Sequence, residues 1–346
     1  MPSTNDRARV SGAAALVVAL VVACAARAEA QQQPQGFSLE RLYPSAPGGG
    51  WVVMDALDMR GGLGGAATMS LGYAHNPLQV ATSDGSQHLA VVTKQASAGF
   101  GFAVTYDRFR LYLNMDMPLV TKGDVTRGSD TVANYTFSPP TVDVGTNPDL
   151  LTDARVGFDT RILGDARSPF RLGAGAQLFV PNGTRADYVT DGSYRAMARV
   201  LFAGDVGALS YAAHLGVHVR PLDDAPAPGS PQGSELLFGV AAGPRLRVSD
   251  DGRVVVVVGP EIFGATAFRS FFGTTTTALE GLLTGRLEGT AEHGAQIRVK
   301  LGAGGGMNAH FGAPEWRMLF AIEVFDHGGG PRTPAPLPMP TPTADR

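Results

Sequence analysis

The sequence contains a single cysteine, Cys24, so no disulfide can form within one chain. Beyond its N-terminal region it has no run of about 18 apolar residues, the length that a transmembrane helix requires. It also lacks an excess of positive charge, because 28 Lys and Arg face 31 Asp and Glu, giving a formal net charge of −3. Without a basic cluster to neutralise phosphates, nucleic acid is not an expected partner. Any membrane span of the mature chain must therefore be made by strands.

The N-terminus has the features of an export signal. Two arginines precede an apolar run over residues 10–23, and Ala28-Glu29-Ala30 supplies a small-x-small cleavage pattern. We therefore expect residues 1–30 to be a signal peptide and residues 31–35 to be a flexible start of the mature chain. The residues that end at Cys24 also resemble a lipobox, in which the thiol is lipidated after cleavage, but ordinary processing is the favoured interpretation.

The dominant pattern is an alternation of apolar and polar residues with a period of two, which runs through residues 150–220 in four consecutive segments. Segments 109–120 and 316–325 repeat it. Successive side chains of a strand point to opposite faces, so these segments predict amphipathic β-strands. In one of them the apolar face holds Tyr194, Ala196, Ala198, Val200 and Phe202, and the polar face holds Arg195 and Arg199.

The two faces of these strands indicate a membrane barrel. The apolar faces are smooth, whereas the polar faces carry charges of both signs and many glycines, as in a barrel with lipid outside and a polar lumen inside. The connections between these strands, at residues 164–169, 182–193 and 204–208, are short, long and short. This order is typical of periplasmic turns that alternate with outer loops. We predict an all-β, antiparallel transmembrane β-barrel over residues 36–326, in the cell outer membrane of a Gram-negative bacterium.

The strand count depends on a weak segment near the N-terminus, residues 37–43, which precedes a strand expected at 51–60. With strands at 37–43 and 51–60 the barrel has about 14 strands, an even number as in bacterial barrels, and 12 is the alternative. Residues 121–149 are expected to form a long outer loop, either mobile or folded into the lumen. Aromatic residues at the strand ends are expected to form interfacial girdles; they are Phe109, Phe170, Tyr194, Phe202, Tyr211 and Trp316.

Polar faces of the predicted strands supply the residues expected to line the lumen. His214 and His218 share one face but lie about 13 Å apart, too far to bind one metal ion directly. No nucleophile motif accompanies them, so neither an enzyme nor a cofactor is predicted. The expected lumen residues are Arg155, Arg161, Arg195, Arg199, His214, His218, Arg220, Arg245, Arg298 and Lys300, together with Asp153, Asp159, Glu235, Glu261 and Glu280.

Two functions are compatible with this charged lumen. A barrel of about 14 strands encloses more space than side chains fill, which favours a passive, porin-like pore, and the basic excess favours small anionic solutes. Alternatively, the charges pair across neighbouring strands and fill a non-conducting barrel that supports envelope integrity. A lipid-anchored β-sandwich that binds a ligand is a second alternative. The expected partners of the barrel are outer-membrane lipid and the outer-membrane barrel assembly machinery.

Four short motifs carry a resemblance to a known family: GFSLER at 36–41, Trp51 with DALDMRG at 55–61, VPNGT at 180–184 and GDVG at 204–207. Together they resemble the enlarged N-terminal barrel of certain OmpA-family proteins, over about residues 36–325. In that family a Pro-rich linker leads to calcium-binding repeats and a peptidoglycan-binding domain. Here the Gly- and Pro-rich residues 327–346 are an extended tail or linker, expected in the periplasm, and its partner is not indicated. The resemblance therefore does not imply cell-wall anchoring.

Overall fold

A computed structural model describes residues 37–326, with gaps at 82–87, 123–129, 133–134, 138–151, 167, 184, 186–187, 223–230, 251–252, 291–294 and 309–312. The predicted signal peptide, the flexible residues 31–35, the tail 327–346 and most of the predicted loop 121–149 therefore lie outside the described residues. None of the helices in the described ranges is long and apolar enough to cross a membrane.

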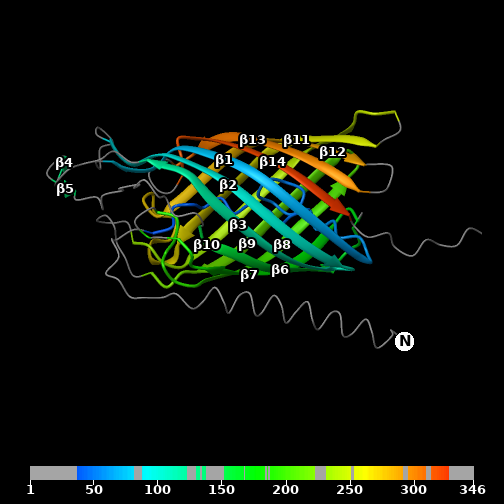
Figure 1. The fold of residues 1–346 in the computed structure, drawn as a ribbon, viewed down its shortest axis with the longest axis horizontal. Helices are drawn as coiled ribbons and strands as arrows, with labels where there is room; N and C mark the ends of the chain where they lie inside the picture. Colours follow the sequence, from blue (N-terminus) through cyan, green and yellow to red (C-terminus); the bar gives the residue numbers. More distant parts are fainter. Residues whose placement is uncertain are drawn as a thin grey trace, which may run out of the picture.

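Twelve antiparallel strands form one closed barrel (Figure 1), which confirms the predicted fold class and the alternative count of 12. β14 pairs with β1 from Gly65↔Asp326 to His75↔Trp316 and closes the sheet. One closed sheet is not a sandwich of two, so the β-sandwich alternative is wrong. The barrel strands are β1 Leu63–Ala81, β2 His88–Tyr106, β3 Phe109–Lys122, β6 Ala154–Leu163, β7 Arg171–Val180, β8 Arg195–Val206, β9 Leu209–Val219, β10 Glu235–Arg247, β11 Val254–Ala267, β12 Thr277–Thr290, β13 Gln296–Gly306 and β14 Trp316–Asp326; β4 Asp130–Val132 and β5 Tyr135–Phe137 pair separately.

The two ends of the barrel differ in their connections. At one end tight turns join β2 to β3 and β8 to β9, with Asp107 and Gly207 at positive φ of 53° and 59°. This is the short-turn end, where β1 begins and β14 ends. At the other end the connections are longer, such as residues 181–194 between β7 and β8, and this is the long-loop end. In outer-membrane barrels in general, short turns of this kind are periplasmic and longer loops are external.

The strand faces follow the predicted alternation. In β8 the inward side chains of Arg195 and Arg199 are buried, whereas Val200 on the outer face is 44% exposed. Large apolar side chains cover the outer surface, and Phe109, Phe170, Tyr194 and Trp316 are exposed near strand ends. Phe202 and Tyr211 are half-buried.

Residues 37–60 run through the lumen of the barrel and are named the plug segment below. Phe37 packs edge-on against Tyr188 at the long-loop end, with ring centroids 5.7 Å apart. At the other end, Gly61 and Gly62 lead from the plug segment into β1 at the short-turn end. Its side chains are buried inside the barrel; Leu39, Trp51, Met54, Leu57 and Met59 are at most 2% exposed. The segment therefore crosses the whole length of the lumen.

The prediction of strands at 37–43 and 51–60 was wrong. Between these stretches the chain turns sharply through Pro47 and three glycines, with Gly48 and Gly50 at positive φ of 79° and 100°. Leu57 also has a positive φ, of 52°. These conformations interrupt a regular strand, and only a single bridge between Gly50 and Asp55 forms. The apolar residues of the plug segment are buried inside the barrel rather than facing lipid.

Candidate functional site: a plugged lumen

The structure brings the predicted lumen residues together inside the barrel. His214 is only partly buried, and Arg245 lies close to the short-turn end with a side chain that is 34% exposed. The remaining members of the predicted set are buried: Asp153, Arg155, Asp159, Arg161, Arg195, Arg199, His218, Arg220, Glu235, Glu261, Glu280, Arg298 and Lys300. The alternation in the sequence thus predicted that these side chains face inward. The function of the lumen depends on the groups with which they pair.

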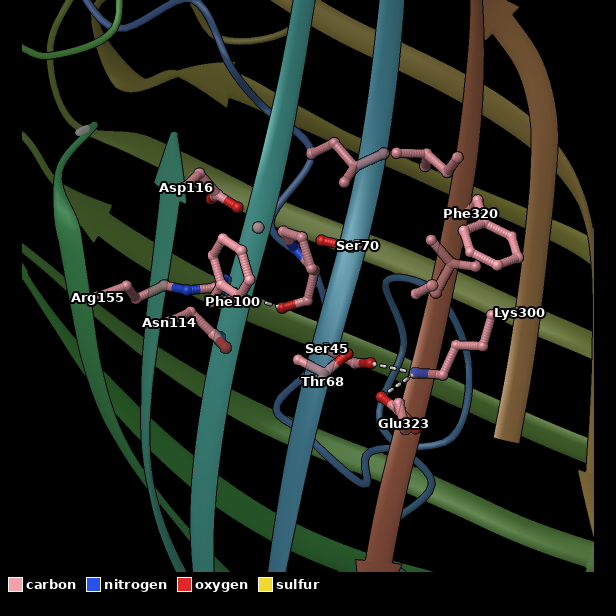
Figure 2. Close-up of a pocket in the computed structure, with 16 residues that line it drawn as sticks. Ser45, Thr68, Ser70, Phe100, Asn114, Asp116, Arg155, Lys300, Phe320 and Glu323 are labelled. Atoms are coloured by element: carbon pink, nitrogen blue, oxygen red, sulfur yellow. Dashed lines mark hydrogen bonds and ion pairs between the residues drawn. The ribbon is translucent and has the colours of Figure 1, made fainter. Parts of the chain in front are cut away.

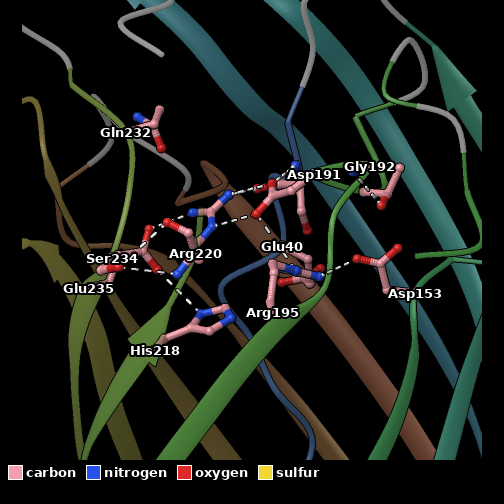
Figure 3. Close-up of polar contacts among 12 residues, drawn as sticks. Glu40, Asp153, Asp191, Gly192, Arg195, His218, Arg220, Gln232, Ser234 and Glu235 are labelled. Carbon is pink, nitrogen blue, oxygen red and sulfur yellow. Dashed lines mark hydrogen bonds and ion pairs between the residues drawn. The ribbon is translucent and has the colours of Figure 1, made fainter. Parts of the chain in front are cut away.

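Near the long-loop end, Arg220 is the centre of a buried ionic network (Figure 3). It donates to Asp191 and to Glu235, at 2.7 and 2.6 Å. From the plug segment, Arg41 lies 2.9 Å from the same Glu235, and the Ser38 N–H donates to Asp191 at 2.8 Å. The plug segment is therefore attached to a wall network that is already paired within itself.

Halfway along the lumen, Glu261 on β11 holds the turn of the plug segment. Its carboxylate accepts from the main-chain N–H groups of Val52, Val53 and Met54 at 2.8, 2.9 and 3.0 Å. From β13, Lys300 donates to the Trp51 carbonyl at 2.9 Å. Three amide donors on one buried carboxylate stabilise its negative charge and fix the turn.

Toward the short-turn end, Arg110 on β3 lies between two carboxylates. Its Nη2 donates to Asp159 of β6 at 2.6 Å and also to Asp55 of the plug segment. All three side chains are at most 1% exposed. Arg161 donates to two plug carbonyls, those of Leu57 and Met59, at 3.0 and 2.5 Å.

Most of the lumen is filled. Beside the plug segment the structure has one cavity of about 100 Å³ and another of about 50 Å³. The smaller cavity lies between β1, β3, β14 and the plug, where Lys300 bonds to Ser45 and Glu323 (Figure 2). Cavities of this size hold a few water molecules. Over the described residues, the plug segment and the wall side chains that contact it thus fill much of the lumen.

Several residues of this site were missed by sequence reasoning. Arg110 carries a signal, because it lies on the polar face of the regular segment 109–120. Asp191 lies in a long connection and has no periodic pattern to indicate its position. Asp55 and Arg41 belong to stretches that were interpreted as strands. In the described ranges, no group of three His, Cys, Asp or Glu side chains is arranged to hold a metal ion.

Acid should not release the contact between Ser38 and Asp191. Burial alone raises the pKa of Asp191, but Arg220, Arg195 and the Ser38 N–H lower it by more, so the pKa lies below its usual range. The contribution of a depressed carboxyl pKa is present above the unfolded value of about 3.9 and is lost only as the pH falls through the folded value. Exchange of the Ser38 amide hydrogen, corrected for intrinsic rate, is expected to stay slow from pH 7 to about 4.5. Asp191→Asn should accelerate it already at pH 7; acceleration of the native amide by pH 5 would contradict this.

Comparisons with known proteins do not show a family for this chain. No family model matches the chain, and no curated protein matches it. An outer-membrane channel from Pseudomonas putida F1 is 11% identical, with 87% of this chain and 99% of that chain covered and a TM-score of 0.49. The NanC porin is 7% identical (75% and 98% covered, TM-score 0.43), and the Ralstonia pickettii toluene transporter TbuX is 11% identical (79% and 91%, TM-score 0.37). None of these TM-scores reaches 0.5, so the fold assignment rests on the strand pairing of the closed barrel, and membership of the OmpA family stays a prediction.

Proposed function

We propose that this chain is an outer-membrane channel that is closed by its own N-terminal segment, residues 37–60. One observation carries the proposal: the wall charges that hold plug side chains are also paired with one another. Without Asp55, Arg110 keeps Asp159, and without Arg41, Glu235 keeps Arg220. The same holds at Arg317, which contacts Glu40 of the plug at 2.9 Å and Glu280 of the wall at 3.0 Å.

This arrangement is what a displaceable plug requires. A buried charge that loses its only partner costs several kcal/mol, which would lock the plug in place. Because these wall pairs are complete on their own, they stay satisfied when the plug moves. The wall groups that bind only the plug main chain, Glu261 and Arg161, would exchange it for water in the opened lumen. A barrel of 12 strands whose lumen accommodates a folded chain segment would then enclose a water-filled path.

The charged side chains of the barrel wall indicate which ions the opened lumen favours. Among the described wall residues, buried Arg and Lys outnumber buried Asp and Glu. A basic excess in a narrow, low-dielectric passage raises the local concentration of anions. The open channel is therefore proposed to prefer small anionic solutes, with Arg195, Arg199, Arg155 and Lys300 among its lining residues.

Planar-bilayer conductance tests the proposal. The full-length double variant Arg41→Ala/Asp55→Ala removes two plug charges and leaves every wall residue unchanged. We expect the native protein to be almost silent, and the double variant to show stepwise currents at least about tenfold more often, with an anion-preferring reversal potential. Arg108→Ala is the control, because it removes an exposed ion pair with Asp107 at the short-turn end; it should leave the currents unchanged.

A second candidate function is a non-conducting barrel that supports the envelope, as the OmpA-family resemblance suggests. The small cavities and the fully buried triad of Asp55, Arg110 and Asp159 favour it. The conductance experiment separates the two functions. If the double variant is folded, as judged by heat-modifiable mobility and β-type circular dichroism, and remains as silent as the native protein, the channel proposal is wrong and the structural barrel stands.

A further inference from the structure

The wall also binds the main chain of the plug segment, and these contacts differ from the side-chain pairs. Glu261 accepts from three consecutive amides, of Val52, Val53 and Met54. Arg161 donates to the carbonyls of Leu57 and Met59. Contacts of this kind depend on the peptide backbone and not on the identity of the side chains that the peptide carries.

Three wall residues are devoted to these backbone contacts. In the described part of the chain, the carboxylate of Glu261 and the guanidinium of Arg161 make hydrogen bonds only to the plug main chain. Arg155 donates to the Pro44 carbonyl at 2.8 Å. All three wall side chains are at most 7% exposed. Unlike Arg110 or Arg220, they are left without their main partners when the plug moves.

Their positions mark out a path along the lumen. Arg155 and Arg161 both face inward from β6 and, at six residues apart, are separated by about 20 Å. Glu261 faces inward from β11, so the three residues contact the same plug segment from two strands. The two donors for carbonyls are thus separated by a length that six or so extended residues would span, and the acceptor for amides faces the same lumen.

We propose that the opened lumen conducts short peptides, and that the plug segment occupies the peptide path. The inference rests on the proposed channel function and names its solute class. Glu261, Arg155 and Arg161 bind the backbone of the solute, so that the path tolerates different side chains. A small sugar lacks the amide N–H groups that Glu261 accepts, so it gains less from this path.

Liposome swelling with the full-length Arg41→Ala/Asp55→Ala variant tests the solute class. The probes are trialanine and a disaccharide. Because trialanine is smaller and would enter faster by size alone, the rate of uptake is compared with that of a series of sugars and polyols of increasing size. We expect trialanine to enter at least about fivefold faster than the size series predicts. Adding Glu261→Gln and Arg161→Gln should remove this excess while the salt conductance persists. Peptide uptake that follows size alone, in a channel that conducts salt, would overturn the peptide inference and leave the channel proposal intact.

A blocking experiment tests backbone recognition directly. A synthetic peptide of residues 37–60 is added to the conducting double variant, and the current is recorded. The native peptide should block the current, because it carries the Arg41 and Asp55 side chains that the tethered plug of the double variant has lost. A peptide N-methylated at Val52, Val53 and Met54 has lost the three donors to Glu261, and should block at least about tenfold less tightly. Equal block by the methylated peptide would overturn the inference, whereas absence of any current in the double variant would overturn the channel proposal on which it rests.

Discussion

Replacing Arg110 with alanine is expected to destabilise the folded barrel by about 3–5 kcal/mol, because the buried carboxylate of Asp55 then loses its cation beside Asp159, which keeps only Arg199 at 3.5 Å. Asp55 and Asp159 are at most 1% exposed, and Nη2 of Arg110 donates to both. Asp55→Ala should cost far less, about 1 kcal/mol, since Arg110 keeps its bond to Asp159 and the Leu57 N–H loses only its side-chain acceptor. The two partners of one ion pair are thus expected to have unequal effects on stability.

Urea unfolding in lipid bilayers or detergent measures this asymmetry. Trp51 is buried in the plug segment and Trp316 is exposed on the outer wall, so a Trp316→Phe background leaves fluorescence from the lumen alone. The control is Arg108→Ala, whose pair with Asp107 is 54% exposed on both sides; it should change the free energy of unfolding by less than about 0.5 kcal/mol. Adding Asp159→Asn to Arg110→Ala should restore part of the lost stability. If Arg110→Ala and Asp55→Ala lower the free energy of unfolding equally, the contact between Arg110 and Asp55 accounts for the whole effect. The predicted penalty for an unpaired buried carboxylate would then be wrong.

The wall of the barrel was predictable because its environment imposes a period of two. Each strand has lipid on one side and the lumen on the other, so apolar and polar residues must alternate, as they do at Val200 and Arg199. The local sequence is therefore enough to predict each strand, its inward face and its turns. The same alternation identified the buried charges, but it did not show their partners. Arg195 pairs with Asp153 across an intervening strand, which depends on the register of β6, β7 and β8.

The plug segment was not predictable from the same pattern. Phe37 and Leu39 alternate with polar residues as a strand would, and nothing local distinguishes a strand that faces lipid from a segment that is surrounded by wall. Its position is set by long-range contacts, such as the Ser38 N–H with Asp191, 153 residues away, and Asp55 with Arg110. Whether the lumen is open or filled was the main functional question, and it depends on these contacts.

Replacing Gly157 with alanine is expected to prevent most of the protein from reaching the folded barrel. Gly157 on β6 pairs directly with Tyr112 on β3, and an added Cβ would lie 2.1–2.5 Å from atoms of the Tyr112 side chain. The ring has nowhere to move, because it is 2% exposed and its hydroxyl contacts Gln177 at 2.6 Å and Arg199 at 3.2 Å. Overpacking of a tight site costs about 1–3 kcal/mol or more, and displacing Tyr112 also breaks both hydrogen bonds.

The fraction of heat-modifiable protein after refolding into detergent measures this effect, and Gly157→Ala should lower it at least about tenfold. Gly302→Ala is the matched control, because Gly302 also faces inward from a strand but its added Cβ would meet the nearest atom, in Thr284, at an ordinary 3.4 Å. The double variant Gly157→Ala/Tyr112→Ala separates crowding from other causes. Removing the ring opens the space that the methyl group needs, so the double variant should fold better than Gly157→Ala alone. If it does not, the glycine is required for the backbone of β6 rather than for the close packing of Tyr112 against it.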